Sequence, residues 1–186
     1  VVGQILCRYL FERYGATGEV VWAMAGRSES KLQALRSALG EGAGKLPLII
    51  ADAADEAAMT AMCQSTRVVV STVGPYALYG SPLVKACAET GTDYCDLTGE
   101  VQWISRMIAA HEATAKKTGA RIVHCCGFDS IPSDLGVHFL QQQAQQRFGE
   151  PCRRVRMGVR TLRGGFSGGT VASLMNAVQE SVKDPA

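Results

Sequence analysis

The segment from Arg67 to Tyr79, RVVVSTVGPYALY, constrains the fold of this chain more than any other. Its run of apolar β-branched residues predicts a buried strand over residues 68–72, and the Gly74-Pro75 pair predicts a tight turn directly after it. Two strand-like runs with helical stretches between them come before this segment, and two strand–loop–helix units follow it. This alternation of strands and helices is typical of a parallel, doubly wound α/β sheet.

The periodicity of apolar residues places the individual elements along the chain. Near residue 150 the pattern changes: residues 153–163 alternate between apolar and polar, which predicts a strand with one solvated face. A final helix is expected to begin at Thr170. Strands are expected at residues 20–25, 46–51, 68–72, 93–97 and 121–125, and helices at residues 1–14, 29–39, 55–63, 80–90, 101–118 and 130–148.

Composition excludes several classes of protein. The net charge of the 186 residues is +2, which is too small to favour a nucleic-acid partner, and no apolar run is long enough for a membrane span. The seven cysteines form no C-x-x-C pair, so we expect reduced thiols in a cytoplasmic protein, without disulfides or a metal site. The three histidines are isolated in the sequence, and no nucleophile triad or P-loop is present.

Sheets of this kind bind ligands beyond the carboxyl ends of their strands. Arg27 and Ser28 follow the strand at residues 20–25, and Lys31 lies one helical turn later. A dinucleotide fold meets the adenosine ribose at this position, and two cations with a hydroxyl suit a 2′-phosphate. These residues favour NADP as the cofactor, with NAD as the alternative. Arg27 could instead be an exposed residue at the start of a helix.

A dinucleotide fold also needs a glycine-rich turn after its first strand. The chain opens inside a helix and without Met, so we expect a fragment that lacks this strand and turn and is unstable and inactive alone. Gly3 could be the last glycine of the turn, or a small residue where helix and sheet pack closely. The strands at residues 20–25 and 68–72 would then either leave a gap between their inner edges or pair directly.

Two further loops are candidates for contact with the cofactor. Asp52 ends the strand at residues 46–51 and could either bind the adenine amino group or cap the next helix. The loop after the strand at residues 68–72 could bring its backbone close to the cofactor, or it could be a simple turn. This second loop consists of Val73, Gly74, Pro75 and Tyr76.

Polar residues also follow the last two strands of the expected sheet. Asp96 and Asp129 lie in loops at the same edge as the cofactor loops, together with Glu100. Carboxylates gathered there could move protons or hold a substrate cation, and helix capping is the alternative. The start of the helix at Thr170 follows two glycines, and it should either point toward this cleft or serve packing alone.

Several segments together resemble the saccharopine dehydrogenase-like oxidoreductases, and in particular their trans-acting enoyl reductase branch. They are AGRSESKL, VVVSTVGPYALYG, GTDYCDLTGE, HCCGFDSIPSDLG and RGGFSGGTVAS. The resemblance implies a Rossmann-like domain at residues 1–150 that lacks its first strand, followed at residues 151–186 by the beginning of a second, α+β substrate domain. It also implies an NADP-dependent reductase of an enoyl group on an acyl or polyketide substrate.

The resemblance leaves some properties open. The substrate could be a small molecule or an acyl chain, and a homodimer is one arrangement that the protein could adopt. A non-catalytic nucleotide-binding or scaffold protein that retains the fold is the alternative to an enzyme.

Overall fold

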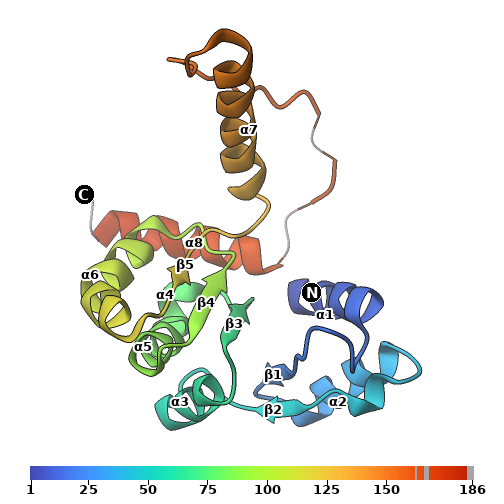
Figure 1. The fold of residues 1–186 in the computed structure, drawn as a ribbon. Helices are drawn as coiled ribbons and strands as arrows, with labels where there is room; N and C mark the ends of the chain where they lie inside the picture. Colours follow the sequence, from blue (N-terminus) through green and yellow to red (C-terminus); the bar gives the residue numbers. More distant parts are fainter. Residues whose placement is uncertain (162, 166–167, 184–186) are drawn as a thin grey trace.

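A computed structural model describes residues 1–161, 163–165 and 168–183 of the chain. Its strands are all parallel and alternate with helices, as expected for the α/β class (Figure 1). The helices are α1 (Val2–Tyr14), α2 (Glu29–Ala38), η1 (Ala43–Lys45), α3 (Glu56–Gln64), α4 (Tyr76–Tyr79), α5 (Ser81–Thr90), α6 (Val101–Thr118), α7 (Ile131–Phe148) and α8 (Gly168–Lys183).

The strands form two separate parallel sheets. One sheet pairs β1 (Met24–Gly26) with β2 (Leu48–Ile50). The other has the order β3-β4-β5, with β3 (Val68–Ser71), β4 (Asp93–Asp96) and β5 (Ile122–Val123). β1 and β3 do not pair with each other. The structure therefore leaves a gap between these two strands, which is one of the two arrangements expected from the sequence.

All five strands are shorter than the sequence predicts, and particular contacts mark the shortened ends of β1 and β5. Before β1, the Trp22 indole nitrogen donates a hydrogen bond to the carbonyl of Gly15 at 2.9 Å, and residues 20–23 run outside the ladder. After β5, Cys125 has a φ of 62°, and the amides of Cys125 and Cys126 bond to the carboxylate and the carbonyl of Asp96 instead of continuing the regular ladder. Both ends of strands are therefore set by local contacts that apolar periodicity does not encode.

Side-chain capping marks the start of two helices, α2 and α3. Ser28 accepts a hydrogen bond from the Lys31 amide and caps α2, as expected. Asp55 caps α3 by accepting a hydrogen bond from the Ala58 amide at 3.0 Å. The suggestion that Asp52 caps this helix is therefore wrong. The Asp52 carboxylate instead accepts the Ala54 amide within the preceding turn.

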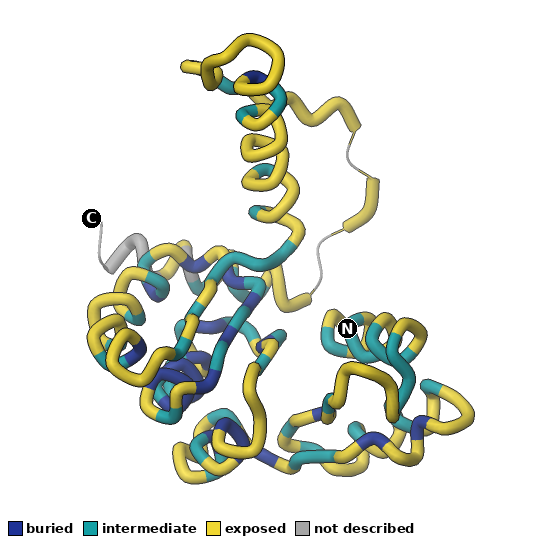
Figure 2. Tube along the Cα trace, in the orientation of Figure 1, coloured by how far each residue is buried: buried dark blue, intermediate teal, exposed yellow. Residues whose placement is uncertain are grey.

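Two hydrophobic clusters support the sheets. The larger one joins β4 to α3, α5 and α6 and includes Tyr94 and Trp103, both 1% exposed. The smaller one lies under β1 and β2 and centres on Met24, Ala43 and Leu46. Each sheet therefore has a core of its own (Figure 2).

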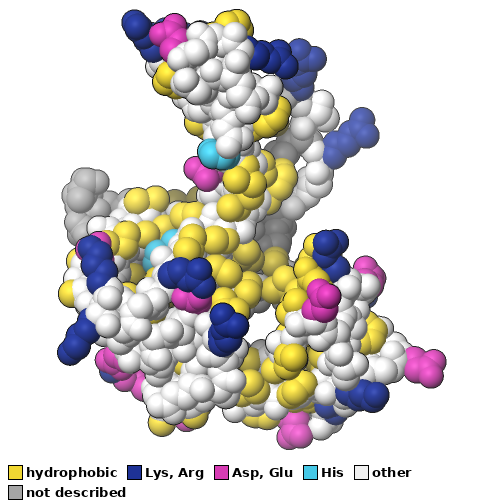
Figure 3. Space-filling view, viewed as in Figure 1, with side chains coloured by type: hydrophobic (Ala, Val, Ile, Leu, Met, Phe, Trp, Pro, Cys, Tyr) yellow, Lys and Arg dark blue, Asp and Glu magenta, His cyan; other side chains and the backbone are white. Residues whose placement is uncertain are grey.

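Helix α7 stands away from both cores. Ala144 is its one buried residue, and most of its length is exposed (Figure 2). Its exposed apolar side chains include Leu135 and Phe139, and Figure 3 shows hydrophobic side chains on the surface of this helix. Gln141 exchanges hydrogen bonds with the Cys152 backbone and holds the following chain against the helix.

Residues 153–161 form no strand, so the predicted strand at 153–163 is wrong over this part, and residue 162 lies outside the described residues. Within the residues that the structure describes, no strand lies beside this alternating segment for it to pair with.

None of the helices in the described ranges combines the length and the apolar character that a bilayer crossing requires.

Candidate functional site

A pocket of about 270 Å³ opens at the carboxyl ends of β3 and β4. The loops after these strands form one wall, and the first turns of α8 form another. The start of α1 also reaches it through Val2. Its lining consists of Val2, Thr72, Gly74, Tyr76, Leu97, Thr98, Gly99, Glu100, Asp129, Gly169, Thr170, Ser173 and Leu174. Residues from five separate parts of the chain therefore meet at the edge of the sheet that the strand order predicts.

The N-terminal end of α8 points toward the cleft, which is one of the two arrangements expected from the sequence. Gly169 and Thr170 line the same pocket as Tyr76, so the N-terminal end of α8 faces the cleft. Backbone amides at the start of a helix favour negative charge and can polarise a carbonyl group. This end of α8 is thus placed to contact a ligand.

Glu100 is the most extensively bonded carboxylate on the pocket wall. It is 4% exposed, and its two oxygens accept the backbone amides of Tyr76 and Ala77, each at 2.8 Å. The hydroxyl of Ser173 donates a further hydrogen bond to it at 2.9 Å. These bonds compensate the free-energy cost of burying the carboxylate.

Tyr76 connects the ends of β3 and β4. Its hydroxyl donates to the carbonyl of Ser71 at 3.1 Å and accepts the amide of Leu97 at 3.2 Å. Burial, and to a lesser degree the nearby charges of Asp96 and Glu100, raises the pKa of Tyr76 to about 12. The neutral phenol is therefore a structural link between the two strands, and its ring and backbone border the pocket.

Asp96 lies behind the pocket rather than on its wall. It is 0% exposed and accepts hydrogen bonds from the Tyr94 hydroxyl and from the amides of Thr98 and Cys125. The expectation that its side chain lines the cleft is wrong, because the carboxylate turns inward to hold the loops that follow β4 and β5. Burial, together with the charge of Asp96, raises the pKa of Tyr94.

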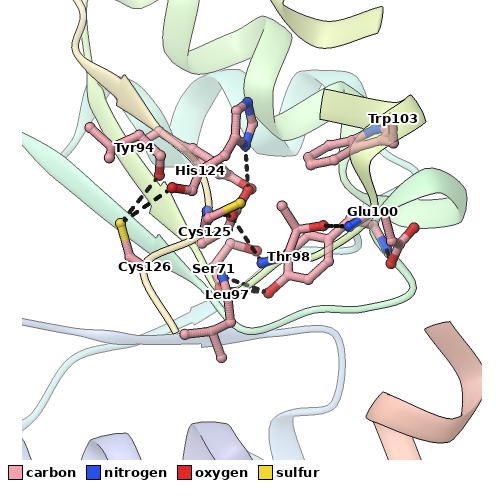
Figure 4. A network of polar contacts seen from close by, with 12 residues as sticks. Ser71, Tyr94, Leu97, Thr98, Glu100, Trp103, His124, Cys125 and Cys126 are labelled. Carbon is pink, nitrogen blue, oxygen red and sulfur yellow. Dashed lines mark hydrogen bonds and ion pairs between the residues drawn. The ribbon is translucent and has the colours of Figure 1, made fainter. Parts of the chain in front are cut away.

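His124 joins this network, although the sequence shows it as an isolated histidine. Its Nδ1 atom lies 2.7 Å from Oδ2 of Asp96 (Figure 4). Its ring also contacts Trp103 edge-on, with the centroids 5.2 Å apart. His124 directly follows β5, and Asp96 is the last residue of β4. Because both residues lie at the same edge of the sheet, their positions in the sequence could have predicted that they are close together.

The other carboxylate named from the sequence does face the pocket. Asp129 is exposed and belongs to the lining. In the loop after β3, Gly74 contributes to the lining, whereas Val73 and Pro75 do not. A Cβ atom added to Gly74 would lie 3.4 Å from the Tyr76 ring and 3.5 Å from Oγ of Ser173, so the loop backbone is closely packed there.

The residues expected to bind the adenosine end lie on the other sheet. Arg27 and Ser28 follow β1 directly, and Lys31 lies in the first turn of α2. The side chains of Arg27 and Lys31 are exposed, and neither has a recorded partner within the described residues. Two unpaired cations beside a hydroxyl fit the 2′-phosphate of NADP. Asp52 is exposed beyond the carboxyl end of the neighbouring β2.

Gly3 lies in the first turn of α1, close to the end of β3. A Cβ atom on Gly3 would lie 3.0 Å from Oγ1 of Thr72, which is closer than side chains normally approach. The glycine therefore allows tight packing of helix and sheet. It also brings the start of α1 to the pocket, where helix amides suit a pyrophosphate.

No cluster of three or more metal-ligating side chains occurs in the part of the chain that the structure describes. All seven cysteines are free thiols in the structure.

Comparison with known proteins adds independent information. Residues 2–123 match the family described as saccharopine dehydrogenase NADP binding domain. A Mycobacterium tuberculosis protein provisionally named as a trans-acting enoyl reductase is 45% identical over 184 residues. That alignment covers 99% of this chain but 43% of the relative. A trans-acting enoyl reductase of Mycobacterium leprae is 45% identical over 164 residues, covering 88% of this chain and 39% of that protein.

A solved structure supports the fold. Saccharopine dehydrogenase (L-Glu forming) from Saccharomyces cerevisiae superimposes with a TM-score of 0.55 at 21% identity. The match covers 73% of this chain and 29% of that chain. The family match extends over most of the sequence and agrees with the cofactor that Arg27, Ser28 and Lys31 predict. The chain therefore belongs to the saccharopine dehydrogenase NADP binding domain family.

Proposed function

We propose that the protein is an NADP-dependent oxidoreductase that reduces an enoyl group on an acyl or polyketide substrate. The observation that carries the proposal is the 45% identity, over 99% of the chain, to a protein named as an enoyl reductase. The pocket supports it, because loops of the nucleotide-binding fold and the start of α8 border the same space. Residues 1–150 form the nucleotide-binding domain in this proposal, and residues 151–186 begin the substrate domain.

Separate parts of the chain would hold separate parts of the cofactor. Arg27, Ser28 and Lys31 bind the 2′-phosphate, and Asp52 contacts the adenine amino group. The start of α1 at Gly3 meets the pyrophosphate. The loop from Val73 to Tyr76, with Gly74 and Pro75, passes beside the nicotinamide end. When bound, NADPH supplies the hydride for the reduction.

The chain's own residues would place the substrate and its proton. Asp129 faces the pocket and is the better-placed carboxyl group to deliver a proton to the substrate carbon. Asp96 acts indirectly, because it holds the amides of Thr98 and Cys125 and thereby fixes the loops around the pocket. The amides at the start of α8 polarise the substrate carbonyl, where negative charge develops during hydride addition.

The test uses the full-length protein, NADPH and crotonyl-coenzyme A as the enoyl thioester. Loss of NADPH absorbance that depends on the thioester, with the saturated thioester as product by mass spectrometry, supports the proposal. Asp129→Asn should lower kcat by at least about 100-fold, and the matched control Asp134→Asn, exposed in the first turn of α7, should not. NADPH binding without turnover of any enoyl thioester would favour a non-catalytic nucleotide-binding protein.

We also propose a cytoplasmic location, where free thiols stay reduced, and a homodimer. Light scattering after size-exclusion chromatography would test the dimer.

A further inference from the structure

Glu100 directly precedes α6, but its side chain does not cap this helix. No side-chain hydrogen bond runs from Glu100 to its own helix. Each carboxylate oxygen instead accepts one of the two amides at the start of α4, those of Tyr76 and Ala77. The side chain therefore fixes the loop that follows β3, on the wall of the pocket.

The same carboxylate also holds α8. Oε1, which accepts the Tyr76 amide, accepts the hydroxyl of Ser173 at 2.9 Å from a position 73 residues along the chain. Ser173 is also close to the backbone at Gly74, since its Oγ would lie 3.5 Å from a Cβ there. One oxygen atom thus joins the two opposite walls of the pocket.

We propose that the Glu100–Ser173 hydrogen bond is a positioning contact that sets the distance between α8 and the loop at residues 74–77. It keeps Gly169 and Thr170 directed into the pocket, where the substrate acyl group binds. This inference rests on the proposed function for the identity of the substrate. The hydrogen bond between Glu100 and Ser173 does not depend on the identity of the substrate.

The contact also indicates which ligand groups the pocket accepts. Glu100 occupies the amides of Tyr76 and Ala77, so these amides are not available to a phosphate. The charge of Glu100 on this wall also repels anions. The part of the pocket around Glu100 therefore takes the uncharged nicotinamide and thioester groups. The phosphates bind at the other sheet and at the start of α1, where Val2 borders the pocket.

Ser173→Ala tests the proposal without disturbing the two backbone bonds to Glu100. We expect the KM for crotonyl-coenzyme A to rise about tenfold, which corresponds to about 1.4 kcal/mol. The Kd for NADPH, measured by its fluorescence, should change less than about twofold. Ser173→Thr keeps the hydroxyl and should restore the KM. Ser105→Ala, at an exposed serine of α6, is the matched control.

A second measurement needs no substrate. Hydrogen exchange of the amides in the first turns of α8 should be faster in Ser173→Ala than in the wild type, Ser173→Thr or Ser105→Ala. If exchange is the same in all four proteins, the proposal is overturned, whatever the enzyme does. If exchange rises but no variant or wild-type protein turns over an enoyl thioester, the positioning contact stands and the proposed reaction is wrong. A tenfold loss of NADPH affinity in Ser173→Ala would also overturn the proposal that this hydrogen bond is a positioning contact.

Discussion

Nδ1 of His124 lies 2.7 Å from Oδ2 of Asp96, although 28 residues separate them in the sequence. The pair connects the loops that follow two adjacent strands, β4 and β5. Both side chains are buried, at 9% exposure for His124 and 0% for Asp96. With the Tyr94 hydroxyl on the same carboxylate oxygen, they form a polar network inside the larger core. Such a network is stabilising only while every member has its partner.

Asp96→Asn should therefore lower the stability of the protein. An amide group at this position would set its own N–H donors against groups that now donate to the carboxylate. We expect a loss of about 1–3 kcal/mol in the free energy of unfolding, measured by urea denaturation. Asp134→Asn is the control on an exposed carboxylate. A midpoint for Asp96→Asn equal to that of the control would show that the network contributes little.

Arg27→Ala should change the preference between the two nicotinamide cofactors. A charge-assisted hydrogen bond to phosphate contributes about 1.5–3 kcal/mol, so NADPH should bind about 10–100-fold more weakly. NADH lacks the 2′-phosphate, and its affinity should stay the same within a factor of about two. Fluorescence titration measures both, with the exposed Arg147→Ala as the control. Equal losses for both cofactors would contradict the assignment of Arg27.

Gly80→Ala should destabilise the junction of α4 and α5. A Cβ atom there would lie 2.7 Å from Cζ2 of Trp103 and 2.9 Å from the carbonyl oxygen of Tyr76. Overpacking of this kind costs about 1–3 kcal/mol, which thermal or urea unfolding would detect. Gly136→Ala is an informative control, because Gly136 lies within α7 with open space around it. That variant should be as stable as the wild type or slightly more stable.

The sequence predicted the helices better than the site. The predicted bounds of α6 agree with the structure, and those of α7 differ by one residue, since glycines mark both C-terminal ends and Pro132 lies in the first turn of α7. Gly119 and Gly149 adopt the left-handed conformation that such ends favour. Glycine and proline at the ends of helices can be recognised in the sequence without knowledge of the fold, so the bounds of these helices could be predicted.

Contacts between distant segments could not be obtained in the same way. The sequence places Glu100 and Ser173 in separate motifs, and no local pattern indicates that one accepts a hydrogen bond from the other. α4 was not predicted because four residues are too few for a helical period. The alternation at residues 153–161 resembles that of a strand, but pairing depends on a neighbour that periodicity does not reveal.

The buried phenol of Tyr76 should make stability depend on pH in the alkaline range. Its pKa in the folded protein is raised to about 12, above the value of an exposed tyrosine. The folded state therefore holds this proton more tightly, so its contribution is complete below about pH 10 and is lost as the pH rises toward 12. Denaturation midpoints should fall more steeply with pH in the wild type than in Tyr76→Phe. Tyr9→Phe, at an exposed tyrosine of α1, should retain the wild-type slope.

The last prediction concerns the thiols of Cys63 and Cys87, whose sulfur atoms lie 3.5 Å apart between α3 and α5. Both residues are 0% exposed, and a hydrogen bond with Cys63 together with burial raises the pKa of the Cys87 thiol. In labelling with an aromatic disulfide reagent, the cysteine thiolate attacks the reagent and releases an aromatic thiolate, so the reagent must reach the sulfur. Neither residue should therefore react in the folded protein. Cys152 is exposed and should react first.

Mass spectrometry of peptides after timed labelling distinguishes these positions. Cys152→Ser should remove the fastest labelling and leave the protection of Cys63 and Cys87 unchanged. Both protected thiols should become reactive together when urea unfolds the protein, because they belong to the same core cluster. Labelling of Cys63 or Cys87 at the rate of Cys152 in native buffer would mean that α3 and α5 separate readily, which their packing in the larger core opposes.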